Sequence, residues 1–513
     1  MPPRVLVIGS GHNGLVCAVH LAEAGLDVEV LEHAPRYGGA SSSGEVTLPG
    51  FVHDHCAGFN PMTVVSPAMR ELELERDGLE WVRGPDVMAH PFEDGTSIVL
   101  HRDVDQTAAG LDLAAPGAGR AWAQLVGQLA PHSERLARTI LSPLPPVRDP
   151  ARIAAALRRD MVELTRRMLA SVEALGLDVF EGAERPTAWL SSSAMHSGLE
   201  PTSAGSGAFG LLLQLLGHTH GWPFPRGGMQ ALADALAGRV RRAGGRIRCD
   251  AHVDEVLVRG GRVAGVRLRG GEEVGGSAVV TTVSAHPLLA MLPREALPER
   301  IVRRLERWRY GTGAFKLDYA LDAPVPWRAP GARTSPVVQV AGELRDLAQA
   351  AQDGSRGAVP ERPALVVGQH TLLDPTRAPA GQHTLYVYAH VPARYAEDDD
   401  EVTARIEAQL ERFAPGWSSH VLARHVRPPW RTEQENPSLV GGDLAGGTYE
   451  LDQLLVFRPM PELVRYRTPL RGLYVAGASV HPGGAVQGMS GRSAAKALLA
   501  DRRLRPWRSA VRG

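Results

Sequence analysis

Val5-Leu-Val-Ile-Gly-Ser-Gly-His-Asn-Gly14 decides the fold. Its four apolar residues, Val5 to Ile8, predict a short buried parallel strand, and a glycine-rich loop follows at once. Small and apolar residues at helical spacing then predict a helix that ends at Gly25. A second strand is expected from Leu26 to Leu31, and Glu32 stands at its end, where an acid can bind an adenosine ribose. This order of elements is typical of a unit that binds an adenine dinucleotide.

The residues of the glycine loop have separate tasks in such a unit. Gly9 permits the tight turn, Gly11 lets the backbone approach a pyrophosphate, and Gly14 lets the helix pack close to the strand. His12 and Asn13 open the helix, whose unpaired N–H groups and positive dipole end favour phosphate. An ordinary strand–turn–helix corner is the alternative, but here every neighbouring condition of the motif is met.

Length and charge limit the classes of protein to consider. At 513 residues the chain is too long for one hydrophobic core, and roughly two to four domains are expected. Lys+Arg and Asp+Glu are both 56, so the formal net charge is zero. Without a basic excess or an acidic tail, we predict no nucleic-acid partner.

Cysteine usage and hydropathy bear on the compartment. Cys17, Cys56 and Cys249 form no C-x-x-C pair, so no local redox disulfide is available, and three scattered thiols fit a reducing environment. The first strand begins too early for a signal peptide, and no apolar run approaches the ~18 residues of a spanning helix. We expect a soluble, cytoplasmic protein.

A second glycine pair lies just beyond the ribose acid, in Arg36-Tyr-Gly-Gly-Ala40. Gly38 and Gly39 free backbone N–H groups to approach another part of the cofactor. Simple nicotinamide dehydrogenases do not require this pair, so it favours FAD over NAD.

The middle of the chain alternates between two kinds of pattern. Residues 61–105 predict strands and turns, and residues 119–216 predict helices rich in alanine and leucine. A helix at 230–243 and strands within 246–283, two of them joined as a hairpin by Gly260-Gly261, then predict a return to the nucleotide-binding sheet, which makes that domain discontinuous. Alternation at 315–321 and 383–390 predicts half-buried antiparallel strands in a second insert.

One helical stretch carries arginine-rich faces. Ala151 to Leu175 has apolar residues at helical spacing, with Arg158-Arg159 and Arg166-Arg167 on the other side. A solvated face is the simplest interpretation, and peripheral contact with an anionic membrane is the alternative.

The last sixty residues repeat the first motif. Gly472 to Ala478 predicts a strand that enters a glycine turn, and His481-Pro-Gly-Gly-Ala-Val-Gln-Gly488 then leads into a helix that ends near Leu499. In a flavoprotein this helix start would face the pyrimidine edge of the flavin, which gains negative charge on reduction. Alone, the motif could equally be a tight turn with a packing role.

Together these blocks resemble the phytoene desaturase-like FAD-dependent oxidoreductases, an amine-oxidase-related flavoprotein family, and within it the bacterial relatives of pyridine nucleotide-disulfide oxidoreductase domain-containing protein 2. The resemblance covers nearly the whole chain. The blocks that carry it are Gly9 to Leu15, Leu48-Pro-Gly-Phe-Val-His-Asp54, Gly221-Trp-Pro-Phe-Pro-Arg-Gly-Gly228, Tyr310-Gly-Thr-Gly-Ala-Phe-Lys316, Asp374-Pro-Thr-Arg-Ala-Pro-Ala380 and His481-Pro-Gly-Gly484.

The resemblance implies an α/β fold in which an α+β substrate domain, an antiparallel sheet plus helices, is inserted into a discontinuous Rossmann-like FAD-binding domain. We place the FAD-binding domain at residues 1–75, 225–295 and 460–505, and the substrate-binding domain at 76–224 and 296–459. The residues expected to hold FAD are Gly9, Gly11, His12, Asn13, Gly14, Glu32, Arg36, Gly38, Gly39, Val253, Gly477, Ala478, Gly484, Val486, Gln487 and Gly488.

Three further side chains are weaker candidates. His481 is the first choice for a catalytic polar group near the flavin, or else a loop histidine bonded to backbone. Arg226 could hold an anionic substrate or a cofactor phosphate, although a structural hydrogen bond is favoured. Lys316 could face the flavin, but the strand pattern favours an exposed lysine.

No metal site is predicted, because four candidate histidines lack ligand spacing to carboxylates or cysteines: His218, His220, His370 and His390.

The favoured function is an FAD-dependent desaturase, dehydrogenase or oxidase that moves a hydride between a C–H bond of an apolar or amphipathic small molecule and flavin N5. The alternatives are an NAD(P)H-dependent reductase or isomerase of a double bond, and a flavin-containing binding or assembly protein with little turnover. Oxygen or a quinone is the expected electron acceptor in the first case. The sequence does not fix the substrate, and it leaves a monomer and a homo-oligomer open.

Overall fold

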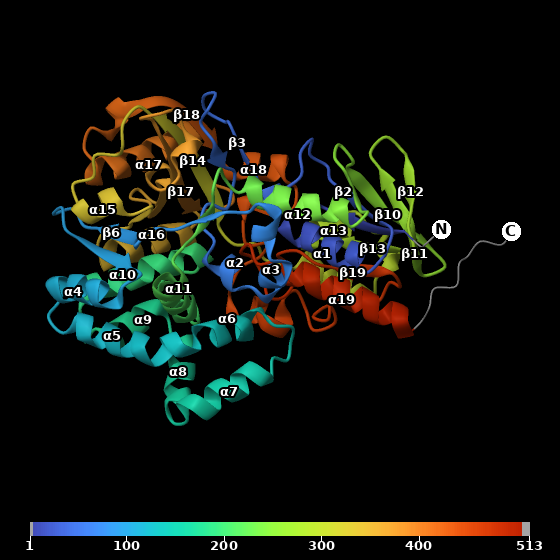
Figure 1. Cartoon of the computed structure of the whole chain (residues 1–513), viewed down its shortest axis with the longest axis horizontal. Coiled ribbons are helices and arrows are strands. Elements are labelled where there is room, and N and C mark those ends of the chain that lie inside the picture. Colours follow the sequence, from blue (N-terminus) through green and yellow to red (C-terminus); the bar gives the residue numbers. More distant parts are fainter. Residues whose placement is uncertain (1–3, 505–513) are drawn as a thin grey trace.

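The computed structural model describes residues 4–504 (Figure 1). Its first organising element is a five-stranded parallel sheet in the order β19-β13-β1-β2-β9. These strands are β1 (Val5–Ile8), β2 (Val28–Leu31), β9 (Arg246–Arg248), β13 (Ala278–Thr281) and β19 (Leu473–Val475). Strands from both ends of the chain and from its middle therefore share one sheet.

Helices on the parallel sheet bring the two ends of the chain into contact. They are α1 (His12–Glu23), α12 (Gln230–Arg242), α13 (Ala285–Ala290), α14 (Glu299–Glu306) and α19 (Met489–Leu504). α1 and α19 pack so closely that a Cβ at Gly491 would collide with the backbone of Asn13. Figure 1 shows α1, β19 and α19 together on the right of the molecule.

An antiparallel sheet of three strands stands beside the parallel one. It contains β10 (Val253–Arg259), β11 (Arg262–Leu268) and β12 (Glu273–Gly275). The predicted hairpin is confirmed: Gly260 and Gly261, with φ of 57° and 70°, make the turn between β10 and β11.

A seven-stranded sheet in the order β18-β14-β17-β16-β15-β6-β7 forms the other half of the molecule. Only its β15–β6 pair is parallel. Its strands are β6 (Asp86–Pro91), β7 (Ser97–His101), β14 (Gly313–Leu321), β15 (Val337–Val340), β16 (Leu365–Gly368), β17 (His383–Val391) and β18 (Val421–Arg427). The sheet is thus assembled from chain before and after the central return to the parallel sheet.

One face of this sheet is covered by helices rich in alanine and leucine, lower left in Figure 1. They are α4 (Val104–Ala114), α5 (Ala118–Leu129), α6 (Ser133–Leu141), α7 (Arg148–Leu157), α8 (Asp160–Leu169), α9 (Val172–Val179), α10 (Glu184–Ala194) and α11 (Ser206–His220). Trp122 and Trp189 are fully buried in their core. The opposite face of the sheet packs against α17 (Asp399–Phe413).

Shorter elements complete the chain. They are β3 (Ser43–Gly44), β4 (His53–Asp54), β5 (Trp81–Val82), β8 (Phe224–Pro225), α2 (Pro61–Val65), α3 (Pro67–Leu72), α15 (Pro330–Thr334), α16 (Leu344–Ser355) and α18 (Pro429–Glu435). In the described part of the chain, no helix is both long and apolar enough to span a bilayer.

The α/β fold class with a second, antiparallel sheet is confirmed, but three local predictions are wrong. Residues 61–72 form two short helices rather than strands, because Pro61 and Pro67 occupy first helical turns. The helical stretch at 151–175 is broken by Arg158, whose φ is 49°. β14 is buried on both faces rather than one, and so is β17 from Thr384 to Ala389.

The predicted domain boundaries stay predictions, and residue 505, the last of them, lies outside the described residues.

Candidate functional site

A cavity of about 1910 Å³ runs between the two halves of the molecule. Typical small-molecule pockets hold ~300–1,000 Å³, so this one has room for a dinucleotide and a second molecule. Its walls come from both ends of the chain and from the seven-stranded sheet.

The glycine loop forms one end of this cavity. Gly9, Gly11, His12 and Asn13 line it, whereas Gly14 packs beneath, where a Cβ would collide with the carbonyl oxygen of Gly9. A Cβ at Gly11 would meet no protein atom within 4 Å. Gly11 caps α1 without a side-chain hydrogen bond, which leaves the first N–H groups of the helix for an anion.

Two buried polar atoms at the start of α1 have no hydrogen-bond partner among the described residues. They are His12 Nε2 and Asn13 Oδ1. Burial lowers the pKa of His12 to about 4, so its ring is neutral at neutral pH. Buried polar groups normally find partners, so these atoms, the free helix start and the open space at Gly11 fit a bound dinucleotide.

Glu32, the predicted ribose ligand, lies on the cavity wall and is 5% exposed. Its Oε2 accepts from Ser10 N (2.8 Å) and Ser10 Oγ (2.5 Å), and its Oε1 accepts from His33 Nδ1 (2.9 Å) and Ala34 N (3.0 Å). Burial alone would raise the pKa of Glu32, but these hydrogen bonds outweigh it and lower the pKa, so the carboxylate is charged.

The second glycine pair folds over the first loop. Gly38 forms an isolated β-bridge with Gly11, and its N–H donates to Ser10 Oγ at 3.2 Å. Gly39 has a φ of 55°, and a Cβ there would lie 3.2 Å from Gly11 Cα. Gly39 lines the cavity, as do Arg36 and Val253, whereas Gly38 lies behind it.

The C-terminal glycine turn forms the far wall. Gly477, Ala478, Gly484 and Val486 line the cavity, and the predicted residues Gln487 and Gly488 do not. Two side chains, one from α2 and one at the start of α3, hold this turn by hydrogen bonds. Thr63 Oγ1 donates to the carbonyl of Val486, and Ser66 Oγ donates to that of Gln487 at 2.5 Å.

His481 also lies on this wall, but a backbone carbonyl holds it. Its Nε2 donates to Ser142 O at 2.8 Å, and its Nδ1 has no partner among the described residues. Burial lowers the pKa of His481, so the neutral ring presents Nδ1 as an acceptor. The structure thus shows a loop histidine bonded to backbone, and a catalytic role for His481 stays a prediction.

Arg458 braces the same wall and was not anticipated from the sequence. It is fully buried and donates to four carbonyls, those of Ala445, Gly447, Thr448 and Ala478, at 2.7–3.3 Å. Its guanidinium lies 4.8 Å from the ring centre of Tyr449. No motif marks this position, because all of its acceptors are backbone atoms.

The rest of the cavity is mostly apolar and aromatic. Its wall comes from α6, α8 and α11 on one side and from β16, β17 and the 444–455 segment on the other. The residues of this apolar lobe include Leu141, Met168, Phe209, Leu212, Leu213, Trp222, Val366, Tyr386, Leu444, Leu451 and Leu455.

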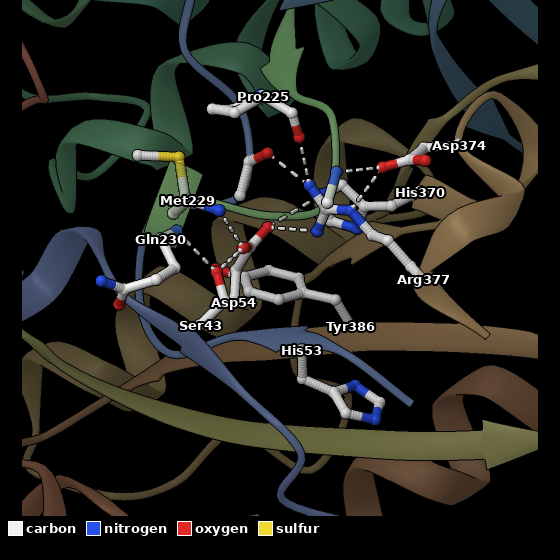
Figure 2. Close-up of polar contacts among 12 residues, drawn as sticks. Ser43, His53, Asp54, Pro225, Met229, Gln230, His370, Asp374, Arg377 and Tyr386 are labelled. Atoms are coloured by element: carbon white, nitrogen blue, oxygen red, sulfur yellow. Dashed lines mark hydrogen bonds and ion pairs between the residues drawn. The ribbon is translucent and has the colours of Figure 1, made fainter. Parts of the chain in front are cut away.

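A buried ion-pair cluster lies outside the cavity lining, next to the loop at 55–60 that does line it (Figure 2). Asp54 Oδ2 accepts from Arg377 Nη1 at 2.6 Å, and its Oδ1 accepts from Met229 N and Ser43 Oγ, both at 2.7 Å. Arg377 also donates to Asp374 and to the carbonyl oxygen of Pro225. The cluster therefore joins three sequence blocks of the family resemblance: 48–54, 221–228 and 374–380. The Asp54 side chain is used entirely in this cluster and does not line the cavity.

Three side chains beside this cluster hold the loop that lines the cavity at 55–60. His370 Nε2 donates to Gly58 O at 3.0 Å, Tyr386 Oη to Cys56 O at 2.5 Å, and Arg427 Nη1 to His55 O at 3.1 Å. The loop carbonyls are thus tied to the seven-stranded sheet and to the turn that follows β16.

Lys316 is not the exposed strand lysine that the pattern favoured. It is 3% exposed, pairs with Asp318, and lies 4.4 Å above the ring centre of Tyr386. Burial opposes charge on Asp318, but Lys316 outweighs it and holds the pKa of Asp318 well below its usual range. Lys316 stays outside the cavity lining.

Arg226 also stays outside the cavity. It is 40% exposed and pairs with Glu80 at 2.7 Å and with Asp374 at 3.6 Å. The geometry therefore supports a structural role for Arg226, which the sequence also favours over binding of a substrate or a cofactor phosphate.

Comparison with known proteins agrees with this architecture. The chain is 29% identical to pyridine nucleotide-disulfide oxidoreductase domain-containing protein 2 of Rattus norvegicus, over 97% of this chain and 93% of that protein. It is 27% identical to the zeta-carotene-forming phytoene desaturase of Myxococcus xanthus, over 94% and 90%. The crystal structure of an oxidoreductase from Methanosarcina mazei shares the fold, with a TM-score of 0.65, 18% identity, and coverage of 97% and 100%.

A model of one protein family matches residues 14–499, from the glycine loop through the C-terminal turn into the last helix. The protein therefore belongs to the flavin containing amine oxidoreductase family, and it is an FAD-dependent oxidoreductase.

Proposed function

We propose that this protein removes a hydride from a C–H bond of an apolar or amphipathic small molecule and leaves a new double bond. The observation that carries the proposal is the single cavity that joins the dinucleotide loops to an apolar lobe. When bound, FAD supplies the hydride acceptor at N5. A relative named a zeta-carotene-forming phytoene desaturase supports this direction of reaction.

The residues of this chain would hold the cofactor along its length. Gly9, Gly11 and the start of α1 are placed for the diphosphate, and Gly39 for its other side. Glu32 is placed for the ribose, where an incoming hydroxyl would replace one of its present donors. The wall formed by Gly477, Ala478, Gly484 and Val486 remains for the flavin end.

The apolar lobe would bind the substrate and exclude water from the reacting carbon. Burial of an apolar molecule there contributes ~25 cal/mol per Å² of area removed from water. Hydrogen bonds to the carbonyls of Gly58, Cys56 and His55 fix the loop at 55–60. This loop would keep the apolar lobe in a fixed position relative to the cofactor end of the cavity.

The direct test is the visible spectrum of the purified protein, followed by anaerobic titration with apolar candidates and with NADPH. Mass spectrometry of any ligand carried in the cavity would supply the first candidates. Bleaching of the flavin by an apolar molecule, with release of a product that has one more double bond, is the expected result. Bleaching by NADPH alone would replace this proposal with reduction or isomerisation of a double bond. A stable flavin spectrum with every candidate would favour a binding or assembly protein.

A membrane surface is the proposed source of such a substrate. Exposed apolar side chains gather where the apolar lobe approaches the surface: Leu169, Leu451, Leu455, Val456 and Phe457 are 40–56% exposed. Leu451 packs on Gly205, whose N–H donates to Leu169 O, so the two ends of this group adjoin. Arg158 and Arg159 precede α8, at the opposite end of that helix from Leu169, and among the described residues they form no ion pair, which leaves them available to anionic headgroups.

Sedimentation with vesicles tests this surface. Wild-type protein should sediment with vesicles that contain phosphatidylserine, and less with neutral ones. Phe457→Ser together with Leu455→Ser should abolish sedimentation, whereas Leu422→Ser, at a 44% exposed leucine on β18, should not. Equal sedimentation of all three proteins would remove the membrane from the proposal.

A further inference from the structure

The apolar lobe contains a hydrogen-bonded polar pair, Tyr388 and His196. Tyr388 stands on β17, His196 lies in the turn after α10, and both line the cavity. Tyr388 Oη is 3.1 Å from His196 Nδ1. Trp222 packs edge-on against the His196 ring at 5.5 Å. Tyr388 pairs with Val366 on one side of its strand and with Lys316 on the other, and its ring lies 5.4 Å from that of His390.

A second layer sets the direction of this hydrogen bond. Gln339 Nε2 lies 2.8 Å from His196 Nε2, while Gln339 Oε1 lies 2.5 Å from Ser192 Oγ. An amide nitrogen can only donate, so His196 Nε2 is an acceptor and the ring carries its proton on Nδ1. Burial lowers the pKa of His196 to about 4, so the ring keeps this neutral form at neutral pH.

The consequence falls on the Tyr388 hydroxyl. Because His196 Nδ1–H donates to its oxygen, the hydroxyl hydrogen of Tyr388 has no acceptor within the described residues. Its neighbour Tyr386 differs, since that hydroxyl donates to Cys56 O at 2.5 Å. A buried donor without an acceptor is costly and favours a ligand that supplies one.

We propose that Tyr388, oriented by His196 and Gln339, donates a hydrogen bond to one oxygen acceptor, such as a carbonyl, on an otherwise apolar substrate. The inference rests on the proposed function, because it takes the apolar lobe as the substrate site. It narrows the substrate class from hydrocarbons in general to apolar molecules that carry one oxygen acceptor.

Isothermal titration of the holoprotein with a matched pair of probes tests this assignment. Carvone differs from limonene by one ketone oxygen, so a single neutral hydrogen bond should make carvone bind about 5- to 10-fold more tightly. Tyr388→Phe should weaken carvone by the same factor and leave limonene unchanged. Tyr386→Phe is the matched control, which should keep the preference because its hydroxyl is already committed to Cys56.

The role of His196 as a positioning residue has its own readout. His196→Ala leaves the Tyr388 hydroxyl in place but without a fixed direction, so the preference for carvone should fall to about 2-fold. A merely structural histidine would weaken carvone and limonene equally. A preference for carveol, the alcohol, over carvone would mean that the Tyr388 oxygen accepts a hydrogen bond from the ligand. That result would overturn the assignment of Tyr388 as a donor.

Two outcomes separate this inference from the proposed function. Equal affinity of the wild-type protein for carvone and limonene would overturn the Tyr388 assignment and leave the apolar site standing. Binding of neither probe, up to its solubility, would count against the apolar substrate site itself.

Discussion

Arg377 Nη1 lies 2.6 Å from Asp54 Oδ2, although 323 residues separate the two in the chain. Their side chains are 1% and 0% exposed. Asp54 belongs to a hairpin beside the glycine loops, and Arg377 follows a strand of the seven-stranded sheet. The pair therefore fastens the two halves of the molecule next to the cavity-lining loop that begins at His55.

Arg377→Met should strongly destabilise the protein. The substitution keeps the side-chain stem but leaves the buried Asp54 carboxylate without its cation, and removal of one member of such a pair costs about 3–5 kcal/mol. Urea unfolding measures the change. Arg259→Met, which breaks a solvent-exposed pair with Glu273 far from this cluster in the sequence, is the control and should have little effect on the midpoint. A similar midpoint for both variants would mean that Asp54 is not held as an anion.

Gly11→Val and Gly14→Val should fail in different ways. A side chain at Gly11 has free space in the protein but occupies the cavity at the start of α1, so the variant should fold and purify without flavin. A side chain at Gly14 meets the carbonyl oxygen of Gly9, so that variant should lose folded protein. Circular dichroism and absorbance near 450 nm (roughly where bound flavin absorbs) separate the two. A yellow Gly11→Val protein would move the diphosphate site elsewhere.

Glu32→Gln should weaken FAD retention about 10- to 100-fold. The charged acceptor at the ribose position is lost, and a hydrogen bond to a charged group is typically ~1.5–3 kcal/mol. Fluorescence of released FAD gives the dissociation constant. His33→Gln, which alters a neighbour of Glu32 but not the carboxylate, should change it far less. Equal retention by Glu32→Gln and wild type would place the ribose contact on another residue.

Acidification should destabilise the protein partly through His370. Burial lowers the pKa of His370 from 6.5 to about 3, so protons bind the unfolded chain more readily. Stability is therefore lost as the pH falls below 6.5, by about 2 kcal/mol between pH 7 and pH 5 for this group. Urea unfolding at the two pH values should show a smaller loss in His370→Gln than in wild type. The same pH dependence in both proteins would mean that His370 does not contribute.

Arg458→Lys should lower the thermal midpoint of the holoprotein even though it keeps the charge. A lysine ammonium cannot reach the four carbonyls that the guanidinium holds, so several charge-assisted hydrogen bonds of ~1.5–3 kcal/mol each are put at risk. Differential scanning calorimetry measures the midpoint, and Arg465→Lys at an exposed position is the control. An unchanged midpoint would show that the wall of the cavity does not depend on this residue.

The parts of this fold that the sequence predicts are those with local causes. The structure from Val5 to Glu32 is determined by one apolar run, three glycines and one acid, all within a single βαβ unit. The same holds for the hairpin at Gly260-Gly261 and for the C-terminal glycine turn. In each case neighbouring residues decide the backbone, so the pattern is sufficient.

The parts that it misses depend on partners far along the chain. The alternation of polar and apolar residues along the strand predicts an exposed Lys316. That pattern cannot show that Asp318 neutralises the lysine or that Tyr386, from another strand, covers it. The blocks that contain Asp54 and Arg377 stand out in the sequence, but nothing in either block says that they meet. No sequence pattern identifies Arg458, because its hydrogen-bond acceptors are backbone carbonyls, which every residue has.

The position of β19 has a consequence for how the protein matures in a cell. Along the chain this strand follows every other strand of the parallel sheet, yet it completes that sheet, and the turn at 477–486 supplies a wall of the cavity. A nascent chain that ends before β19 has the glycine loops but no closed pocket around them. Closure of the pocket therefore requires that β19 and this turn have already been synthesised.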